Sequence, residues 1–368
     1  MSNPLVRLGQ LGQSPWYDHI TRDLVTEGEL ARLIAEDGLR GMTSNPTIFE
    51  KAVSGSRLYD EDIRQLADEG RDAGEIFDAL SAEDVREACD VFRPLYDVSG
   101  HGDGCVSIEV NPALANDTAA TITEAARLWG AVGRPNTMVK IPGTSAGLPA
   151  ITRSTAAGIN VNITLLFSVE RYAQVIDAFL SGLEQRAGRG EDISQIHSVA
   201  SFFVSRVDTK VDALLDKAGD PHGVRGRAAI ANASHAYRLF LETLESPRWR
   251  KLEKKGAKPQ RPLWASTSTK DPKYPDTYYV EALIAPQTVN TLPPDTFAAY
   301  RDHGRPEVRI HDEMARADAD LDALETMGID LRRVTRELEV EGVKKFSDSY
   351  NQLLAGIGAK AESLVARR

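Results

Sequence analysis

Lys140 is the residue of this chain best suited to covalent chemistry, because it lies inside the apolar run MVKIP at 138–142. A lysine in such a run either extends its ammonium group to water or is partly desolvated, and desolvation lowers the pKa of an amine. A neutral amine can form an imine with a ketone, and the imine accepts the electrons released when an adjacent carbon–carbon bond breaks. Position alone leaves the edge lysine and the imine-forming lysine equally open.

Three further polar residues occur at or near the ends of other apolar runs. Glu109 and Thr164 are suited to hold and activate the water that imine formation expels and hydrolysis consumes, although either can be an ordinary satisfied polar residue. Asp18 can take a proton from a hydroxyl group as a carbon–carbon bond breaks. The segment DHITRD at 18–23 is equally acceptable as a helix start with Asp18 as its N-cap, so both interpretations stay open.

A second group of residues is suited to hold a polar substrate. Asn45, Asn162 and Ser201 supply neutral donors and acceptors for the hydroxyl groups of a ketose, although Asn45 and the proline after it are also compatible with a plain turn. Arg206, in SFFVSRVD at 201–208, can bind a phosphate group through two hydrogen bonds. An ion pair with Asp208 or with another carboxylate is the alternative for this arginine.

The metal-binding and redox signals in the sequence are weak. The seven histidines show no HxH or HExxH spacing, and no cluster of acidic residues with histidine suggests a metal. Cys89 and Cys105 are the only cysteines, so the chain can build neither a disulfide framework nor a multi-cysteine zinc site. We therefore expect catalysis without metal or cofactor, in a reducing compartment.

Short apolar runs recur along the chain, each ending in polar residues, Gly or Pro, and amphipathic segments separate them. This alternation is typical of parallel α/β folds. A doubly wound open sheet normally begins with a Gly-rich phosphate loop, which SPWYDHITRD lacks, so the pattern favours a (β/α)8 TIM barrel. The predicted strands are 16–20, 39–45, 106–111, 137–143, 160–167, 198–206, 262–268 and 280–286.

Helical spacing of apolar residues fills the intervals, most clearly at 117–133, 169–188 and 223–244. The long charged connection 46–105, after the second strand, should carry extra helices. The basic insert 246–262 is predicted to be a solvated surface loop. We expect residues 1–368 to form one barrel domain, with 306–368 as a helical C-terminal extension packed on it.

Composition limits the classes of partner. The 368 residues are 42% hydrophobic and 27% charged, with a formal net charge of -10, which argues against non-specific binding to nucleic acid or to an anionic membrane. No stretch approaches the roughly 20 apolar residues of a membrane span, and the N-terminus lacks the apolar core of a signal peptide. A cytoplasmic enzyme is the expectation.

Several motifs, in order along the chain, resemble those of the transaldolase family. This resemblance implies a (β/α)8 barrel with Lys140 as the Schiff-base lysine, Asp18 as the acid/base residue, and Glu109 and Thr164 positioning the catalytic water. The motifs are GMTSNPTIFEKA (41–52), VSIEVNP (106–112), NTMVKIPGTSAGLPAI (136–151), GINVNITLLF (158–167), SFFVSRVD (201–208) and GVKKFSDSYNQLL (342–354).

The same resemblance implies the substrate contacts. Asn45, Asn162 and Ser201 would hold the dihydroxyacetone portion of the donor, and Arg206 would bind its phosphate. After the seventh strand many family members carry a serine followed by an arginine, and here WASTSTKDP supplies Ser266 but has Ser268 at the arginine position. Lys270 is close enough in sequence to replace the missing charge.

The family reaction transfers a dihydroxyacetone unit from sedoheptulose 7-phosphate or fructose 6-phosphate to glyceraldehyde 3-phosphate or erythrose 4-phosphate, in the pentose phosphate pathway. A lyase similar to fructose-6-phosphate aldolase, using the same lysine, is the main alternative. A catalytically silent barrel that binds sugar phosphates is another, because fold alone does not fix function. The sequence leaves a monomer and a homodimer equally open.

Overall fold

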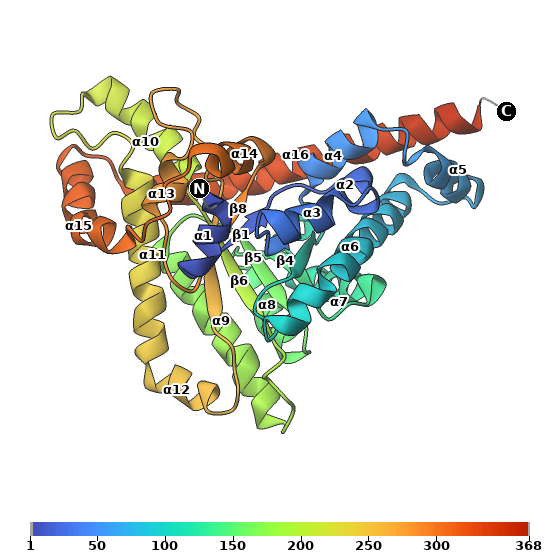
Figure 1. Cartoon of the computed structure of the whole chain (residues 1–368), viewed down its shortest axis with the longest axis horizontal. Coiled ribbons are helices and arrows are strands. Elements are labelled where there is room, and N and C mark those ends of the chain that lie inside the picture. The colour runs from blue at the N-terminus through green and yellow to red at the C-terminus, as the bar shows by residue number, and fades with distance from the viewer. Residues whose placement is uncertain (1–2, 367–368) are drawn as a thin grey trace.

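Eight parallel strands close into a barrel in the computed structural model, which describes residues 3–366. Each strand pairs with the next along the chain, and β8 closes the barrel against β1 (Figure 1). The predicted TIM barrel is therefore confirmed. The strands are β1 Gln13–Tyr17, β2 Gly41–Met42, β3 Cys105–Glu109, β4 Thr137–Pro142, β5 Val161–Leu166, β6 Ser198–Phe203, β7 Gln260–Ala265 and β8 Thr288–Leu292.

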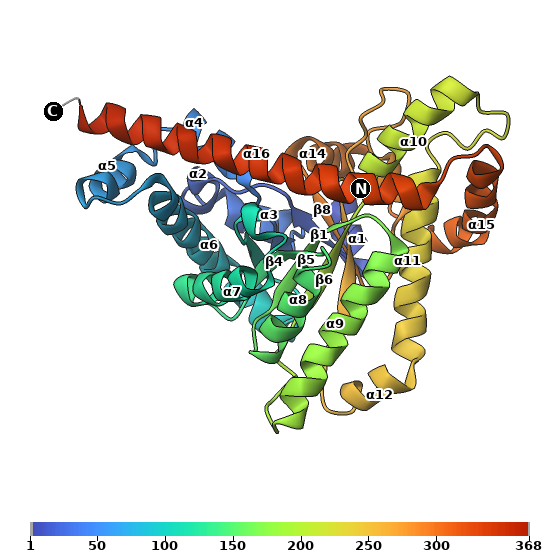
Figure 2. The same cartoon turned by 180° about the vertical axis from the view of Figure 1, so that it is seen from behind.

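Helices surround the barrel, and the segment after β2 carries three of them (α4, α5 and α6), as expected (Figures 1 and 2). The helices are α1 Pro4–Gln10, α2 Arg22–Thr26, α3 Glu29–Glu36, α4 Pro46–Gly55, α5 Asp60–Asp68, α6 Ala73–Val98, α7 Thr118–Val132, α8 Gly147–Ala156, α9 Val169–Gly188, α10 Ser205–Ala218, α11 Ala228–Glu245, α12 Pro247–Glu253, α13 Tyr278–Ala282, α14 Pro294–His303, α15 Ile310–Thr326 and α16 Leu331–Val365.

Local sequence signals explain where α7 and α9 begin and where α7 ends. The side chains of Asp117 and Ser168 accept hydrogen bonds from backbone N–H groups in the first turns of α7 and α9. Gly133 ends α7 with φ of +63°, a left-handed conformation that glycine adopts without steric cost. These ends agree closely with the predicted helices at 117–133 and 169–188.

The predicted eighth strand at 280–286 is wrong. Its residues form the end of α13 and a buried loop, in which the Leu283 carbonyl accepts hydrogen bonds from Gln13 (2.8 Å) and Trp264 (2.9 Å). The actual β8 is the more polar TVNTL, whose Asn290 accepts a hydrogen bond of 2.9 Å from Thr267. An apolar run predicts burial, but it does not distinguish an extended backbone from a helix followed by a loop.

Two further predictions about the middle of the chain need correction. The strand predicted at 198–206 ends at Phe203, and Arg206 lies in the first turn of α10. The insert predicted as a solvated loop at 246–262 begins with α12, which buries Trp249 and Leu252. The basic residues of this helix are partly neutralised, because Arg248 pairs with carboxylates of α9 at 2.6 and 2.8 Å.

The tail consists of α15 and the long helix α16, as the helical spacing predicts. Phe346, Tyr350, Leu353 and Ile357 recur every three or four residues and form a buried stripe on α16. The helix lies along the edge of the molecule where α4 and α10 are found (Figure 2). The tail is therefore held to both early and middle segments of the chain.

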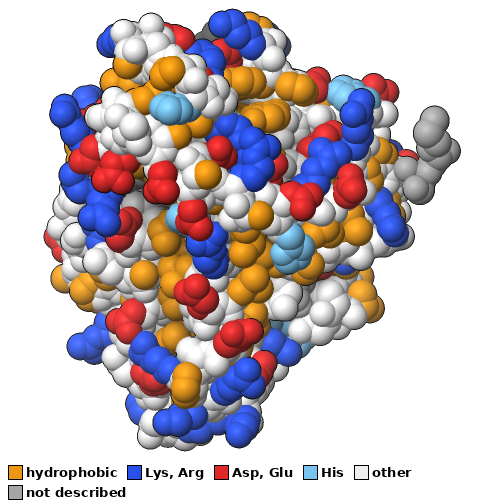
Figure 3. All heavy atoms as spheres, turned by 90° about the vertical axis from the view of Figure 1, so that its left-hand side faces the viewer, with side chains coloured by type: hydrophobic (Ala, Val, Ile, Leu, Met, Phe, Trp, Pro, Cys, Tyr) orange, Lys and Arg blue, Asp and Glu red, His pale blue; other side chains and the backbone are white. Residues whose placement is uncertain are grey.

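Basic and acidic side chains are intermixed on the face formed by α10, α11, α12 and α15 (Figure 3). Part of this mixture is a set of ion pairs between α11 and α15. Arg238 and His235 both contact Asp318, at 3.3 and 2.7 Å. Among residues 3–366, no helix is long and apolar enough to cross a membrane.

The amino-terminal ends of the strands, opposite the end where Lys140 lies, are closed by a polar network. Asp103 accepts hydrogen bonds from Ser14 at 2.6 Å, Arg40 at 3.0 Å and Arg261 at 3.3 Å. His197, just before β6, is 6% exposed and packs edge-on against aromatic rings. This end of the barrel is therefore tightly packed.

Candidate active site

A cavity of about 520 Å³ opens at the carboxyl ends of the strands. This is the end at which (β/α)8 barrels carry their active sites. Two larger hollows, of about 620 and 770 Å³, lie between outer helices, and neither is lined by a lysine. The predicted residues that line the cavity at the strand ends are Asp18, Asn45, Lys140, Thr164, Ser201, Arg206, Ser266 and Lys270.

Lys140 and Glu109 form a buried ion pair beside this cavity. They are register partners on β4 and β3, so their side chains point to the same side of the sheet. The Lys140 Nζ lies 3.0 Å from the Glu109 carboxylate and 3.0 Å from the Ser44 carbonyl oxygen, and the two side chains are 6% and 4% exposed. Burial raises the pKa of Glu109, and the charge and hydrogen bond of Lys140 oppose this shift. An amine and a carboxylate are thus held where they can exchange a proton.

The side chain of Asn162 links β3 and β6. It is the register partner of Lys140 on β5 and is fully buried. Its Nδ2 donates to Ser107 at 3.0 Å, and its Oδ1 accepts from Ser201 at 2.7 Å. Ser201 lines the cavity, so Asn162 fixes the orientation of a hydroxyl group at the cavity wall.

A β-bulge in β5 aims Thr164 into the cavity. The pairing of β5 with β6 shifts register between Ile163 and Leu166, and Leu165 adopts a φ of +61°, which is unusual for a branched side chain. Thr164 Oγ1 and Glu109 Oε1 are buried, and neither has a hydrogen-bond partner within residues 3–366. Each of these atoms is therefore available to a water molecule or a substrate oxygen.

Asp18 is held by the hydroxyl group of Thr43, which also contacts Thr291. Thr43 Oγ1, just after β2, donates to the Asp18 carboxylate at 2.6 Å and lies 2.7 Å from Thr291 Oγ1 on β8. Burial raises the pKa of Asp18, and Lys140 and the Thr43 hydrogen bond oppose the shift. The carboxylate therefore lies in the field of the central lysine.

The helix-cap alternative for Asp18 is wrong, because α2 begins later, at Arg22, with Thr21 as its N-cap. Asn45, by contrast, has both roles that the sequence leaves open: it belongs to a local backbone motif, and it lies at the cavity. Its Oδ1 accepts a hydrogen bond of 3.1 Å from Ile48 N and caps α4, while the residue also lines the cavity.

Arg206 is held by aromatic rings instead of a carboxylate. Its guanidinium carbon lies 5.0 Å from the ring centre of Phe203 and 5.9 Å from that of Phe346, on α16. Asp208 accepts hydrogen bonds from Ala229 N at 2.7 Å and Tyr279 at 2.8 Å, so the alternative ion pair with Arg206 is wrong. The guanidinium donors stay available to a ligand in the cavity.

The residues after β7 lie next to Arg206. Ser266 has a φ of +56°, and its Oγ lies 3.0 Å from Ser205 Oγ at the start of α10. Lys270 Nζ donates to Ser268 Oγ at 2.6 Å. Burial lowers the pKa of Lys270, and the nearby charges of Arg206 and Lys345 lower it further.

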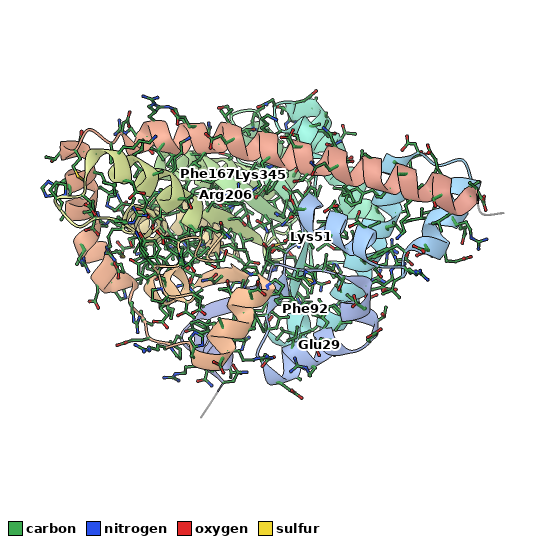
Figure 4. The ribbon with its side chains drawn as sticks, turned by 90° about the horizontal axis from the view of Figure 1, so that it is seen from above. Glu29, Lys51, Phe92, Phe167, Arg206 and Lys345 are labelled. Carbon is green, nitrogen blue, oxygen red and sulfur yellow. The ribbon has the colours of Figure 1, made fainter. Side chains whose placement is uncertain are left out.

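Seven polar residues that line the cavity are not predicted from the sequence: His19, Thr43, Thr47, Lys51, Thr291, Asp295 and Lys345. Thr291 was missed because the eighth strand was placed too early, and Thr43 because its neighbour Asn45 was the more obvious polar group. Lys51 and Lys345 are on helices α4 and α16, and only the packing of those helices turns them toward the cavity. Figure 4 shows Lys345, on α16, near Arg206, on α10, with Lys51 on α4.

The fold and the site are those of a (β/α)8-barrel enzyme with a buried lysine at the mouth of the barrel. The family model described as Transaldolase/Fructose-6-phosphate aldolase matches residues 15–357. The chain belongs to this family.

Curated relatives match this chain over almost its whole length. A protein of Frankia alni named Transaldolase is 53% identical over 362 residues, which is 97% of each chain. The Transaldolase of Acidothermus cellulolyticus is 53% identical and covers 98% of both chains. The Transaldolase of Trichodesmium erythraeum is 45% identical, again over nearly all of both chains.

Proposed function

We propose that this protein is a transaldolase. It transfers a dihydroxyacetone unit from sedoheptulose 7-phosphate or fructose 6-phosphate to an aldose phosphate, through an imine on Lys140. The observation that carries the proposal is the buried pair of Lys140 and Glu109 at the mouth of the barrel, beside a cavity bordered by several cations. The names of the relatives support the same activity.

Imine formation begins when the Lys140 ammonium group gives a proton to Glu109, 3.0 Å away, and the resulting amine attacks the ketone carbon of the donor. Glu109 passes two protons in turn from the nitrogen to the ketone oxygen, which leaves as water, and the third proton of the ammonium group stays on the imine nitrogen. Thr164 Oγ1 and Glu109 Oε1, both buried and without protein partners, hold that water for the later hydrolysis. Elimination of one water balances the formation of the carbon–nitrogen double bond.

Carbon–carbon cleavage requires a base for the sugar hydroxyl group. Asp18, held by Thr43, takes this proton while the bond to the adjacent carbon breaks. The bonding electrons pass to the protonated imine, which becomes an enamine, and an aldehyde departs. Asn45 and Ser201, with Ser201 oriented by Asn162, hold the hydroxyl groups of the remaining three-carbon unit.

The fate of the enamine separates transfer from simple cleavage. An enamine that attacks a second aldehyde completes a transfer, and one that is protonated and hydrolysed releases dihydroxyacetone, as in an aldolase-like lyase. Polar contacts that hold the enamine in the cavity favour its reaction with the acceptor aldehyde over protonation and release. The name Transaldolase on relatives of about 50% identity also favours transfer. The silent-barrel alternative fits poorly, because all the catalytic positions carry competent residues.

The phosphate of the donor is proposed to bind at Arg206, Ser266 and Lys270. A guanidinium held between two rings offers several parallel N–H donors, which match phosphate oxygens. Ser266 and Lys270 line the same cavity and add a hydroxyl group and a second charge.

Borohydride reduction in the presence of fructose 6-phosphate, followed by peptide mapping, tests the imine. The three-carbon unit is expected on Lys140, because no other lysine is a strand-end residue beside a buried carboxylate. Attachment to Lys210 or Lys270 instead would contradict the assignment. Lys140→Arg, which keeps the charge but is never a neutral amine, should yield no adduct. Assay of free dihydroxyacetone without an acceptor aldehyde then separates transferase from lyase.

We further propose a cytoplasmic location and a single domain in which 306–366 packs on the barrel; residues 1–2 and 367–368 of the predicted domain lie outside the described part of the chain. Two free, buried cysteines, Cys89 and Cys105, suit a reducing compartment. The intermixed surface charge and the net charge of -10 do not favour nucleic acid as a partner. A monomer and a homodimer both stay compatible with this function.

A further inference from the structure

The cavity is bordered by four cations that lack carboxylate partners. Lys51, Arg206, Lys270 and Lys345 line it, and among residues 3–366 none of them lies within 4.0 Å of a carboxylate oxygen. On the same helix as Lys345, the adjacent Lys344 pairs with a carboxylate at 2.7 Å. Two carboxylates, Asp18 and Asp295, line the same cavity, so the cations outnumber them and leave an excess of positive charge that suits an anion.

We propose that Lys345, on the C-terminal helix α16, is a specificity-determining residue that binds the phosphate of phosphorylated substrates together with Arg206. This inference rests on the proposed function, since it assigns a new residue to the substrate end of that site. Lys345 is exposed on α16 but lines the cavity, so its ammonium can meet a phosphate entering from solvent.

The neighbouring residue fixes where Lys345 lies. Phe346 is 7% exposed and packs over the Arg206 guanidinium at 5.9 Å, while Phe203 covers the same group from the barrel at 5.0 Å. The helix thus presents an aromatic ring and an ammonium group, side by side in sequence, to one arginine. Figure 4 shows Lys345 and Arg206 close together along α16.

Lys345 and Lys270 line the same cavity as Arg206. Burial lowers the pKa of Lys270, and repulsion by Arg206 and then by Lys345 contributes to the shift. Lys270 already donates a hydrogen bond of 2.6 Å to Ser268, whereas Lys345 has no such partner among residues 3–366. A dianionic phosphate would relieve the repulsion among all three cations.

Two sets of contacts hold α16 on either side of the cavity. Lys360 donates to the carbonyl groups of Val53 at 2.9 Å and Ser56 at 2.6 Å, next to α4. Lys210, on α10, pairs with Glu337 at 2.8 Å and Glu341 at 2.6 Å. The position of Lys345 between these anchors requires no movement of the helix to reach a ligand.

Binding of inorganic phosphate to the full chain, measured by isothermal titration calorimetry, tests the proposal. Lys345→Ala should raise the dissociation constant roughly 5- to 20-fold, as expected for loss of one exposed charge-assisted hydrogen bond. Lys345→Arg should restore most of the affinity. Lys344→Ala is the matched control, because it removes the same charge one residue away from the cavity, and it should bind phosphate like the wild type.

A steady-state assay provides a second readout. Lys345→Ala should raise the KM for fructose 6-phosphate with little change in kcat, and trapping of unphosphorylated dihydroxyacetone on Lys140 should be unaffected. Unchanged phosphate affinity in Lys345→Ala, or an equal loss in Lys344→Ala, would overturn the proposal. If the proposed function itself is wrong, the result is distinguishable from these outcomes, because the wild type would then give no borohydride adduct on Lys140, whatever its affinity for phosphate.

Discussion

Thr43 donates a hydrogen bond of 2.6 Å to Asp18, and this contact joins the ends of β1 and β2 at the mouth of the barrel. The bond stabilises the charged form of the carboxylate and so opposes the rise in its pKa that burial causes. The same hydroxyl group lies 2.7 Å from Thr291 on β8. Three neighbouring strands thereby fix the proposed base.

Thr43→Val should raise the pKa of Asp18, because the hydrogen bond that lowers this pKa is lost. Activity that needs the Asp18 carboxylate then disappears at a higher pH than in the wild type. We expect the acidic limb of the kcat profile to move to higher pH and the rate near neutrality to fall roughly 10-fold. Thr43→Ser, which keeps the hydroxyl group, is the control. An acidic limb that stays in place in Thr43→Val would refute the coupling.

Asp18→Asn should separate imine formation from bond cleavage. The amide cannot take the hydroxyl proton, so carbon–carbon cleavage should fall by roughly 10²–10⁴-fold. Trapping of dihydroxyacetone on Lys140 by borohydride should persist, because Glu109 serves that step. Equal loss of trapping and turnover would assign Asp18 to imine formation instead.

Arg206→Ala should weaken the use of fructose 6-phosphate by about 1.5–3 kcal/mol in kcat/KM, because it removes a charge-assisted contact to the phosphate. Lys270→Ala should have a smaller effect of about 1 kcal/mol, since this side chain is more exposed to solvent. Unphosphorylated fructose should be nearly indifferent to both changes. If Lys270→Ala keeps the wild-type preference for the phosphorylated donor, Lys270 is only a surface lysine.

Activity should survive exhaustive treatment with EDTA. The imine on Lys140 provides the electron sink that a divalent metal would otherwise provide, so the reaction needs no Lewis acid. Turnover of fructose 6-phosphate with an acceptor aldehyde is the measurement, before and after dialysis against the chelator. Loss of turnover that zinc restores would require a different mechanism.

His197 should make the stability of the barrel depend on pH. Burial lowers its pKa from 6.5 to about 4, so at intermediate pH the unfolded chain binds a proton that the folded chain does not. The contribution of neutral His197 to the free energy of unfolding is fully present above pH 6.5. It is lost as the pH falls toward 4, by on the order of 3 kcal/mol.

Chemical unfolding of His197→Gln and wild type from pH 7 to pH 4 measures this effect. The difference in unfolding free energy between the two proteins should shift in favour of the variant as the pH falls. His303→Gln is the control, because two carboxylates raise the pKa of that exposed histidine and the dependence has the opposite sign. A constant difference for His197→Gln would assign the titration to another group.

Periodicity and motif order in the sequence were enough to predict the barrel, the added helices after β2 and the helical tail. Apolar runs and helical stripes are local signals, and the packing of parallel strands in a closed sheet follows from their alternation. The same signals predict that Lys140, Glu109 and Thr164 belong to strands, and these strands are β4, β3 and β5.

Only the tertiary structure decided contacts between distant segments. The link from Thr43 to Asp18 and Thr291, and the position of Lys345 beside Arg206, depend on how strands close and how α16 lies across the mouth. From the sequence alone, the side chain of a lysine on a helix can point in many directions, and the local helix geometry does not determine which one. Packing against α4 and α10 selects one direction, because the buried stripe of α16 can face the barrel in only one way.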